Sequence, residues 1–323
     1  MKKAAKAWLI TAAFLVLAGC ILFAGVMSTL GWDFAKLSTA RYETNIHEIS
    51  ETFSDISLTT DTADIVFALS NDGKCRVECY EPENAKHSAA VANDTLIIEI
   101  NEQKSWYDYI GFQFGSPRIT VYLPQAEYGA LSISESTGRI EIPKDFSFER
   151  ADISASTGSV VFSAAAQAAV KIKTGTGNIC VENNSAGSLD LSVTTGKAAV
   201  SNVTCVGSLT INVSTGAAYL TDVACKSVLS NGTTGDISLQ NVIAAEKISI
   251  ERSAGSVKFD GSDAAEIYVR TSTGDVAGSL LTDKVFMTQT DTGNVGVPQT
   301  ITGGKCEIHT DTGDIQEPAQ NFL

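Results

Sequence analysis

Apolar and polar residues alternate along most of this 323-residue chain, and the alternation is centred on a glycine that recurs every 19 or 20 residues. The second residue after each of these glycines is apolar, and the residues five and seven positions before it are apolar in most repeats. A period of two is typical of β-strands with one buried face. Each repeat is therefore predicted to be a strand, a tight turn, a second strand and a second turn. The glycines are Gly138, Gly158, Gly177, Gly196, Gly216, Gly235, Gly255, Gly274, Gly293 and Gly313.

A fixed period of this length indicates coils that stack on one another, because a single coil cannot bury its own apolar face. Equivalent strands of successive coils are then expected to pair in parallel and in register, about 4.8 Å apart. The predicted fold class is all-β: a β-solenoid, or single-stranded parallel β-helix, with 19–20 residues per coil. Threonine precedes the glycine in nine of the ten repeats, and the glycine is assigned to a turn position with positive φ.

The turns are not expected to form a repeating metal site. The residue that follows the glycine varies and includes Arg139, Lys197 and Ala217, which do not ligate a hard cation. We therefore predict no metal and no cofactor. The places that would best suit an ion are two aspartate pairs, Asp291 with Asp311 and Asp275 with Asp314.

The N-terminal segment is predicted to cross a membrane. Residues 7–32 contain no Asp, Glu, Lys or Arg and are mostly apolar, which is long enough for a transmembrane helix. Lysines precede this run, so the positive-inside rule places residues 1–6 in the cytoplasm, a signal anchor at 7–30 in the membrane, and the rest outside. As an alternative, the sequence LAGC ending at Cys20 resembles a lipobox, in which Cys20 would be lipidated. Both interpretations tether an extracytoplasmic domain to the cell membrane.

Outside the membrane the sequence divides into three parts. Residues 31–50 are predicted to be a juxtamembrane linker, residues 51–130 irregular N-terminal coils, and residues 131–323 the regular repeats. Within the irregular part, the sequence DTADI at 61–65 resembles a turn of the repeat with Ala63 in place of the glycine. Terminal repeats are usually atypical in this way.

Two features depart from the repeat and are the candidate binding sites. Five aromatic residues gather within nine positions, and they form either an exposed loop that binds a partner, a glycan or a membrane, or a flap that covers the open end of the solenoid. At the other end, only residues 316–323 follow the last repeat, so the last coil is expected to be a free edge that self-associates or pairs with a partner. The aromatic residues are Trp106, Tyr107, Tyr109, Phe112 and Phe114.

The formal net charge is −14, and the three lysines of the cytoplasmic end contribute +3, so the external part carries −14 − 3 = −17. An acidic surface of this size repels nucleic acid and anionic lipid. It is compatible with a solvated face and with cationic partners, and we expect no nucleic-acid partner.

Among the seven cysteines, Cys205 and Cys225 are placed in equivalent positions, each nine residues after its turn glycine. They are therefore expected to stack on adjacent coils, at a separation that overlaps the range for disulfides. Paired buried thiols and a disulfide both remain open, because an in-register parallel pair can lack the required Cβ geometry.

The sequence carries no signature of an enzyme. The three histidines, His47, His87 and His309, are scattered, and no metalloprotease, nucleophile-elbow, P-loop or dinucleotide motif is present. Parallel β-helices that act on polysaccharides build a groove from long loops, whereas these repeats are nearly free of loops. We predict that the protein is not an enzyme, with a polysaccharide-active enzyme as a remote alternative.

Several segments together resemble a known family. The run from Gly31 to Thr39, the segment WYDY at 106–109, the strand ITVYLP at 119–124 and the ladder of STG(D/N)(I/V) sequences are similar to the bacterial "putative adhesin", or toast-rack, domain of Gram-positive membrane proteins. The resemblance implies a membrane-tethered extracytoplasmic β-solenoid, often linked to envelope-stress systems, with no catalytic residues. The expected function is a binding or scaffold protein that contacts other envelope proteins, with an adhesin for glycans or host protein as the alternative.

Overall fold

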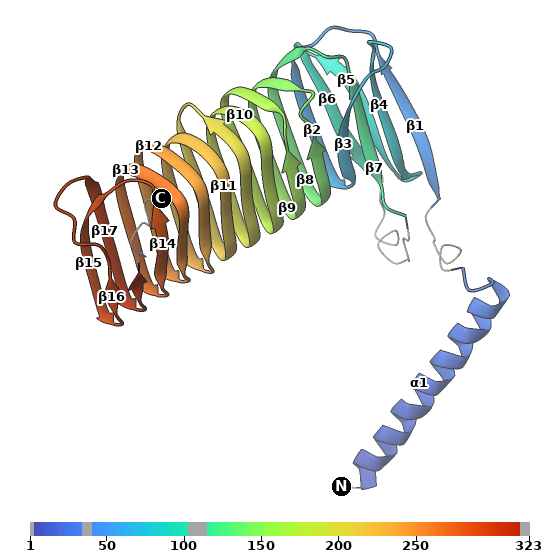
Figure 1. Cartoon of the computed structure of the whole chain (residues 1–323). Helices are drawn as coiled ribbons and strands as arrows, with labels where there is room; N and C mark the ends of the chain where they lie inside the picture. The colour runs from blue at the N-terminus through green and yellow to red at the C-terminus, as the bar shows by residue number, and fades with distance from the viewer. Residues whose placement is uncertain (1–2, 34–40, 103–114, 317–323) are drawn as a thin grey trace.

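A computed structural model describes residues 3–33, 41–102 and 115–316 of the chain. This part contains one helix and eighteen strands, and all the strands belong to a single sheet that winds into stacked coils (Figure 1). The helix is α1 (Lys3–Thr29). The strands are β1 (Tyr42–Ile49), β2 (Asp55–Thr62), β3 (Asp64–Leu69), β4 (Cys75–Pro82), β5 (Ala85–Ala92), β6 (Thr95–Glu102), β7 (Arg118–Leu123), β8 (Glu127–Ile142), β9 (Ser147–Phe162), β10 (Ala165–Cys205), β11 (Ser208–Thr234), β12 (Ile237–Ala254), β13 (Val257–Thr273), β14 (Val276–Leu280), β15 (Lys284–Thr292), β16 (Val295–Gly296), β17 (Gly304–Thr312) and β18 (Ile315–Gln316).

Successive coils pair in parallel and in register, as the period predicts. Gly138 lies opposite Gly158 and Gly196 lies opposite Gly216, so the turn glycines form one continuous row along the solenoid. The predicted fold class, an all-β solenoid with one N-terminal apolar helix, is confirmed.

The turn row requires glycine for two reasons, which Gly196 illustrates. Its φ is 142°, a backbone conformation that residues with a side chain rarely adopt. A Cβ atom added there would also lie 1.8 Å from the carbonyl oxygen of Gly177 in the preceding coil. The prediction of positive φ is thus confirmed, and close stacking of the backbone adds a second constraint.

The second turn of the coil, which the repeat predicts, is built differently, from residues that the sequence analysis did not identify. Six residues after the turn glycine, the middle coils place an asparagine or aspartate with φ between 51° and 53°, as at Asn183, Asn202 and Asp222. These short polar side chains tolerate the left-handed region. The Asn202 amide donates to Asn183 Oδ1 at 2.8 Å, so the side chains also bond from coil to coil.

The interior contains one continuous apolar cluster. Several buried polar residues lie in one row, three positions before a turn glycine, as do Glu135, Thr174 and Arg252. Where that row holds threonine, the hydroxyl group donates to the carbonyl of the turn glycine in the adjacent coil, as Thr271 does to Gly255 at 3.0 Å. Thr174, Thr290 and Thr310 make the same bond.

Arg252 occupies this row and is 4% exposed. Its guanidinium fills the space beside Gly232, where a Cβ atom would overlap it, and it donates to the Val213 carbonyl at 3.3 Å and to Ser230 Oγ at 3.0 Å.

Replacing Arg252 with alanine is expected to lower the free energy of unfolding by about 2 kcal/mol, because the change empties this space and removes both hydrogen bonds. Thermal denaturation of the full chain followed by circular dichroism measures the loss. R270A, at an exposed position of β13, is the matched control and is expected to change stability by no more than about 0.5 kcal/mol. Equal effects of the two variants would contradict the prediction.

The N-terminal end of the solenoid is closed by antiparallel strands. β2 and β3 form the first coil against β8, with Ala63 in the position of the turn glycine as predicted, since Thr62 pairs with Thr137 and Ile65 with Ile140. β6 and β7 form a further parallel coil outside them. β5 then pairs with β6, and β4 with β7, both antiparallel.

Part of the segment that we predicted to be a linker belongs to this end. Tyr42–Ile49 forms β1, which pairs antiparallel with the whole of β4. Residues 42–49 therefore do not belong to the linker: β4 supplies their partner strand, although YETNIHEI lacks the alternation of polar and apolar residues that would have predicted a strand. The three antiparallel pairs, β1–β4, β4–β7 and β5–β6, explain why residues 51–130 do not show the 19–20-residue period.

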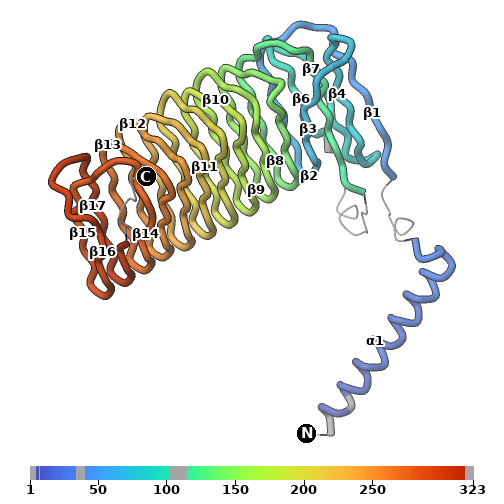
Figure 2. The backbone as a smooth tube through the Cα atoms, viewed as in Figure 1, coloured from blue at the N-terminus to red at the C-terminus, as the bar shows by residue number. Residues whose placement is uncertain are grey.

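The coils at the C-terminal end do not follow sequence order (Figure 2). β17 and β18 pair with β13 and β14 on one side and with β15 and β16 on the other. The last coil of the sequence is therefore inserted, and β15–β16 is the outermost coil in space. We predicted that the last coil of the sequence is the free edge, and this is wrong: the coil at the free edge is β15–β16.

A buried ion pair fastens this arrangement. Lys284 of the outermost coil is 3% exposed, and its Nζ lies 2.5 Å from Asp263 Oδ1 of β13, two coils away. The Lys284 side chain passes Gly304 of the inserted coil, the residue with which Lys284 pairs in register. A Cβ atom added at Gly304 would lie 3.4 Å from Lys284 Nζ. The missing side chain at Gly304 thus lets a lysine reach across the inserted coil.

Candidate functional site

The polar residues of the turns are occupied by structural hydrogen bonds. In five turns, the side chain that follows the turn glycine accepts the backbone N–H of its equivalent in the next coil; these acceptors are Asn178, Asp236, Ser256, Asp275 and Asp314. Asp275 Oδ1 accepts from Asp314 at 2.8 Å, and Asp314 Oδ1 accepts from Asn294 at 2.8 Å. The pair Asp275 and Asp314, which we considered for an ion, is thus part of this turn ladder. Asp291 and Asp311 are both exposed on adjacent coils.

The predicted aromatic site lies outside the described residues. Trp106, Tyr107, Tyr109, Phe112 and Phe114 fall within 103–114, in the segment that joins β6 to β7. Their role as a binding loop or flap stays a prediction.

Cys205 and Cys225 follow paired positions of adjacent coils, Thr204 and Ala224, and are 4% and 7% exposed. Both are free thiols in the structure, which is the alternative that the spacing left open. Burial, and secondarily the neighbouring Cys225, raises the pKa of Cys205 to about 12.

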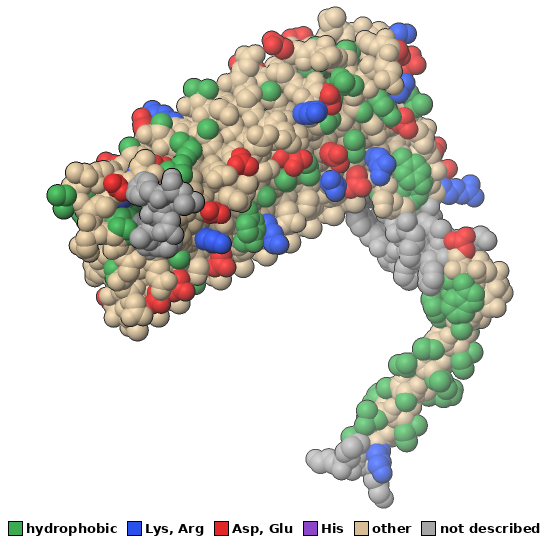
Figure 3. Space-filling model, in the orientation of Figure 1, with side chains coloured by type: hydrophobic (Ala, Val, Ile, Leu, Met, Phe, Trp, Pro, Cys, Tyr) green, Lys and Arg blue, Asp and Glu red, His purple; other side chains and the backbone are tan. Residues whose placement is uncertain are grey.

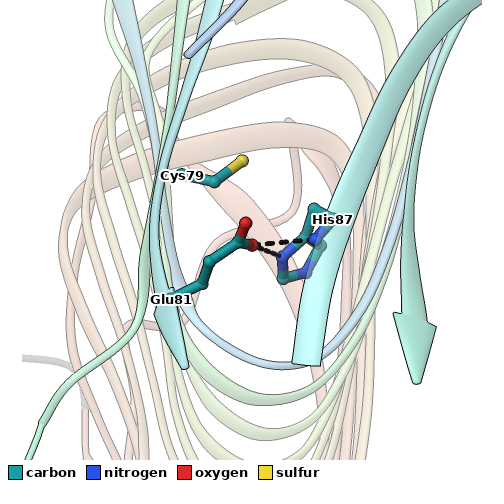
Figure 4. A group of neighbouring side chains, drawn as sticks. All are labelled: Cys79, Glu81 and His87. Carbon is teal, nitrogen blue, oxygen red and sulfur yellow. Dashed lines mark hydrogen bonds and ion pairs between the residues drawn. The ribbon is translucent and has the colours of Figure 1, made fainter. Parts of the chain in front are cut away.

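The antiparallel strands β1, β4 and β5 at the N-terminal end, here called the cap, contain a cluster of buried polar side chains that the sequence did not reveal. Cys79 and Glu81 lie two residues apart on β4, so they share a face, and His87 of β5 lies opposite them (Figure 4). Their exposed fractions are 0%, 1% and 5%. The signal available from the sequence was the strand spacing of Cys79 and Glu81, but the turn between β4 and β5 that brings His87 to them has no motif of its own.

Hydrogen bonds connect this cluster to the first coil. His87 Nδ1 lies 2.6 Å from Glu81 Oε2, and His87 Nε2 lies 2.8 Å from Thr60 Oγ1. The Glu81 carboxylate also accepts the His87 backbone N–H at 2.8 Å and the Asn45 amide at 2.8 Å. Burial raises the pKa of Glu81, but the bonds from His87 and Asn45 outweigh it, so the pKa lies below its usual value. Burial raises the pKa of Cys79 to about 12.

The order Thr60, His87 and Glu81 matches the nucleophile, base and acid of a hydrolase. However, each of the three is 5% exposed or less, so no substrate reaches the Thr60 hydroxyl group. The arrangement is therefore a buried hydrogen-bonded network and not an active site.

Glu135 extends the buried polar region on the other side of Thr60, with which it pairs in register. It is 4% exposed, and neither of its carboxyl oxygens has a hydrogen-bond partner among the described residues. Burial, and then the negative charge of Asp64, raises the pKa of Glu135 to about 8.

A cavity of about 510 Å³ opens at the N-terminal end, between the end of β1 and the starts of β4 and β8. Its apolar lining includes Ile49, Phe53 and Tyr128, with Lys74 and Arg76 at the polar side. The volume is within the range of ligand pockets. Tyr128 donates to the Pro124 carbonyl at 2.8 Å, and its ring stacks on Phe53 with centroids 6.1 Å apart.

The opposite end presents an open sheet edge. Among the described strands, β15 pairs with β17 and with no strand on its other side. Val295 shows the consequence: it is 47% exposed, whereas the equivalent Ile315 of the inserted coil is 1% exposed. Leu281, Met287 and Ile301 are also exposed at this end, by 54%, 46% and 94%.

The stacked parallel coils define a β-solenoid, and α1 contains a span, Trp8–Thr29, that is long and apolar enough to cross a membrane. The family described as Toastrack DUF4097 matches residues 53–212 and 203–320. These matches cover most of the chain, and the protein belongs to this family. No curated protein matches the chain significantly.

Several solved structures are similar to this chain. One, described as a putative lipid binding protein from Parabacteroides distasonis ATCC 8503, is 16% identical and has a TM-score of 0.43, covering 75% of this chain and 95% of its own. A putative adhesin from Bacteroides fragilis NCTC 9343 is 16% identical with a TM-score of 0.34, covering 86% and 97%. A putative adhesin from Parabacteroides merdae ATCC 43184 is 14% identical with a TM-score of 0.34, covering 86% and 98%. All three scores are below 0.5, so the fold rests on the strand pairing of this chain.

Proposed function

We propose that this protein is a membrane-tethered, extracytoplasmic rod that binds another cell-envelope protein through its outermost coil and catalyses no reaction. The observation that carries the proposal is the open edge of β15, together with the exposed side chains of Leu281, Met287 and Ile301 beside it. An unpaired edge strand offers backbone groups to a strand of a partner. Adjacent apolar side chains add the contact area that such pairing needs.

The rest of the surface supports this assignment. On the face shown in Figure 3, acidic side chains are spread along the solenoid with basic ones among them, rather than gathered in one patch. The turn residues are bonded from coil to coil, as described for Asp275 and Asp314. The apolar span of α1 supports a membrane anchor at the opposite end, so that the open edge would be presented away from the membrane.

The role of the contact follows from the resemblance to toast-rack proteins linked to envelope-stress systems. We infer that the rod is an accessory of such a system and recognises a strand of another membrane protein. Pairing of two copies through the same edge, and binding of wall glycan or host protein as an adhesin, are the competing outcomes of the experiment.

The edge can be blocked by proline without disturbing the core. The Thr292 carbonyl accepts the Gly313 N–H of β17, and backbone groups alternate in direction along a strand, so Gln289 directs its N–H away from β17. Q289P is therefore expected to fold normally and to remove pairing at the edge. Q240P, in the central strand β12, is the matched control and is expected to destabilise the solenoid.

The test places a photo-crosslinking residue at Met287 of the full chain in native membranes, and at Lys171 of β10 for comparison. We expect a cross-linked product of defined mass from position 287 only, reduced at least tenfold by Q289P. A product of twice the chain mass identifies a second copy instead. Equal cross-linking from both positions, or binding to purified wall glycan that Q289P leaves unchanged, contradicts the proposal.

A further inference from the structure

The cluster of Cys79, Glu81 and His87 combines three kinds of donor atom at one buried point. The Cys79 sulfur, a Glu81 carboxylate oxygen and a His87 ring nitrogen all lie within 4.8 Å of one another. The side chains converge between β4 and β5, as Figure 4 shows. Among the described residues, this is the group of three such side chains that could hold a metal ion.

The arrangement of donors matches what zinc requires. Thiolate, imidazole and carboxylate are the ligands of Zn²⁺ in proteins, with bonds of about 2.0–2.3 Å. Ligand atoms around one tetrahedral ion therefore lie roughly 3.3–3.6 Å apart. The His87 and Glu81 atoms, now 2.6 Å apart, would separate by less than an ångström to admit the ion, and small side-chain rotations supply that movement.

The surrounding residues already hold the ligands in the orientation that a metal needs. A ligating histidine usually donates its other ring N–H to an oxygen, which fixes the tautomer. His87 Nε2 lies 2.8 Å from Thr60 Oγ1, so Nδ1 is the nitrogen directed at Glu81. The Asn45 amide donates to Glu81 Oε1 at 2.8 Å, which leaves Oε2 on the side of His87.

A purely structural network explains the hydrogen bonds but not the choice of residues. A buried carboxylate and imidazole cost desolvation energy, and apolar residues of similar volume would serve the packing of the cap at least as well. The thiol of Cys79 adds nothing to the bonds of Glu81 or His87. A divalent cation would account for all three side chains at once, because it neutralises the buried carboxylate and binds the sulfur.

We propose that Cys79, Glu81 and His87 form a Zn²⁺ site that joins β4 to β5 and stabilises the antiparallel cap of the solenoid. The site supplies three of four tetrahedral positions from two consecutive strands, β4 and β5. Because the ligands are buried, its role is structural, and it is independent of the binding edge at the other end of the rod.

The experiment uses the full chain in detergent, stripped of metal with a chelator and then dialysed against ZnCl₂. We expect elemental mass spectrometry to find one zinc ion per chain. Adding zinc back to the stripped protein is expected to raise its unfolding temperature. Co²⁺ in place of zinc is expected to give the near-ultraviolet charge-transfer band of a thiolate ligand together with the visible bands of a tetrahedral ion.

Variants assign the ligands. C79S and H87Q are each expected to lower the bound zinc at least tenfold, and C79S to remove the cobalt charge-transfer band. C225A, a buried cysteine of β11, and H309Q, whose ring lies 3.1 Å from Glu307 at a partly exposed site, are the matched controls and keep full occupancy.

Two results would overturn the proposal. One is a folded wild-type chain that retains less than a tenth of an equivalent of zinc and shows no thiolate band with Co²⁺. The other is full zinc occupancy in C79S and H87Q. If either variant fails to fold, the cobalt spectra of the wild type and of C225A decide whether a thiolate binds the metal. Both proteins keep Cys79, Glu81 and His87, so a thiolate band in both supports the site and its absence in both contradicts it.

Discussion

Replacement of Gly196 by alanine is expected to disrupt the centre of the solenoid. The φ of 142° disfavours any side chain, and the added Cβ would lie 1.8 Å from the Gly177 carbonyl oxygen. The obstacle is backbone that is itself paired on both sides, so it cannot move away cheaply. We expect a loss of about 4 kcal/mol or more in the free energy of unfolding, at the upper end of single substitutions.

The form of the unfolding curve should change as well. Backbone pairing joins each coil to its immediate neighbours, so a weak coil in the middle is expected to divide the stack into two units. G196A is therefore expected to replace one thermal transition by two, measured by circular dichroism of the full chain. G296A is the matched control: no atom lies within 4 Å of its added Cβ and its φ is not positive, so the change should stay within about 0.5 kcal/mol. Similar curves for both variants would show that the glycine row is not essential.

The regular part of the fold was predictable because its pattern is local. The turn glycine, the buried residue two positions later and the alternation on both sides recur within each coil, and stacking needs no further information. The second turn was expected, but its residues were not identified, because Asn183, Asn202 and Asp222 are polar residues in a polar region. Their shared feature, φ near 52°, is visible only in the structure.

The order of the last three coils could not be read from the sequence. The sequences DTGNV and DTGDI, at Gly293 and Gly313, offer nearly the same turn and an apolar residue at the same position to the coil of Gly274. The observed order is accompanied by a long-range contact, in which Lys284 reaches Asp263 past Gly304 of the inserted coil. Insertion places the C-terminal coil between two others, which protects it from fraying.

The candidate sites were predictable to different degrees. A free C-terminal edge followed from the short tail, but its assignment to Lys284–Gly296 required the pairing of β15 with β17. The cluster of Cys79, Glu81 and His87 was not predicted, because its members are ordinary strand residues until β4, β5 and the coil of Thr60 come together.

Replacement of Glu135 by glutamine is expected to make the protein markedly more stable at alkaline pH. The carboxyl group is 4% exposed and without a hydrogen-bond partner among the described residues, and it lies near Asp64. Its pKa is about 8 in the folded protein against an ordinary value of 4.5. Charging it therefore opposes folding, whereas a glutamine at this position stays neutral.

The direction of the pH effect follows from proton binding. Between pH 4.5 and about 8 the folded state holds the Glu135 proton and the unfolded state does not, so wild-type stability falls as the pH rises through this range and levels off above it. The full difference is at most about 5 kcal/mol, at 1.36 kcal/mol per pKa unit. Unfolding midpoints measured from pH 5 to pH 9 should therefore converge for wild type and E135Q at the acidic end and diverge at the alkaline end. E149Q, at an exposed glutamate of β9, should track the wild type throughout. If the unfolding midpoints of wild type and E135Q differed by the same amount at every pH, Glu135 would be ionised in the folded protein, which would contradict the prediction.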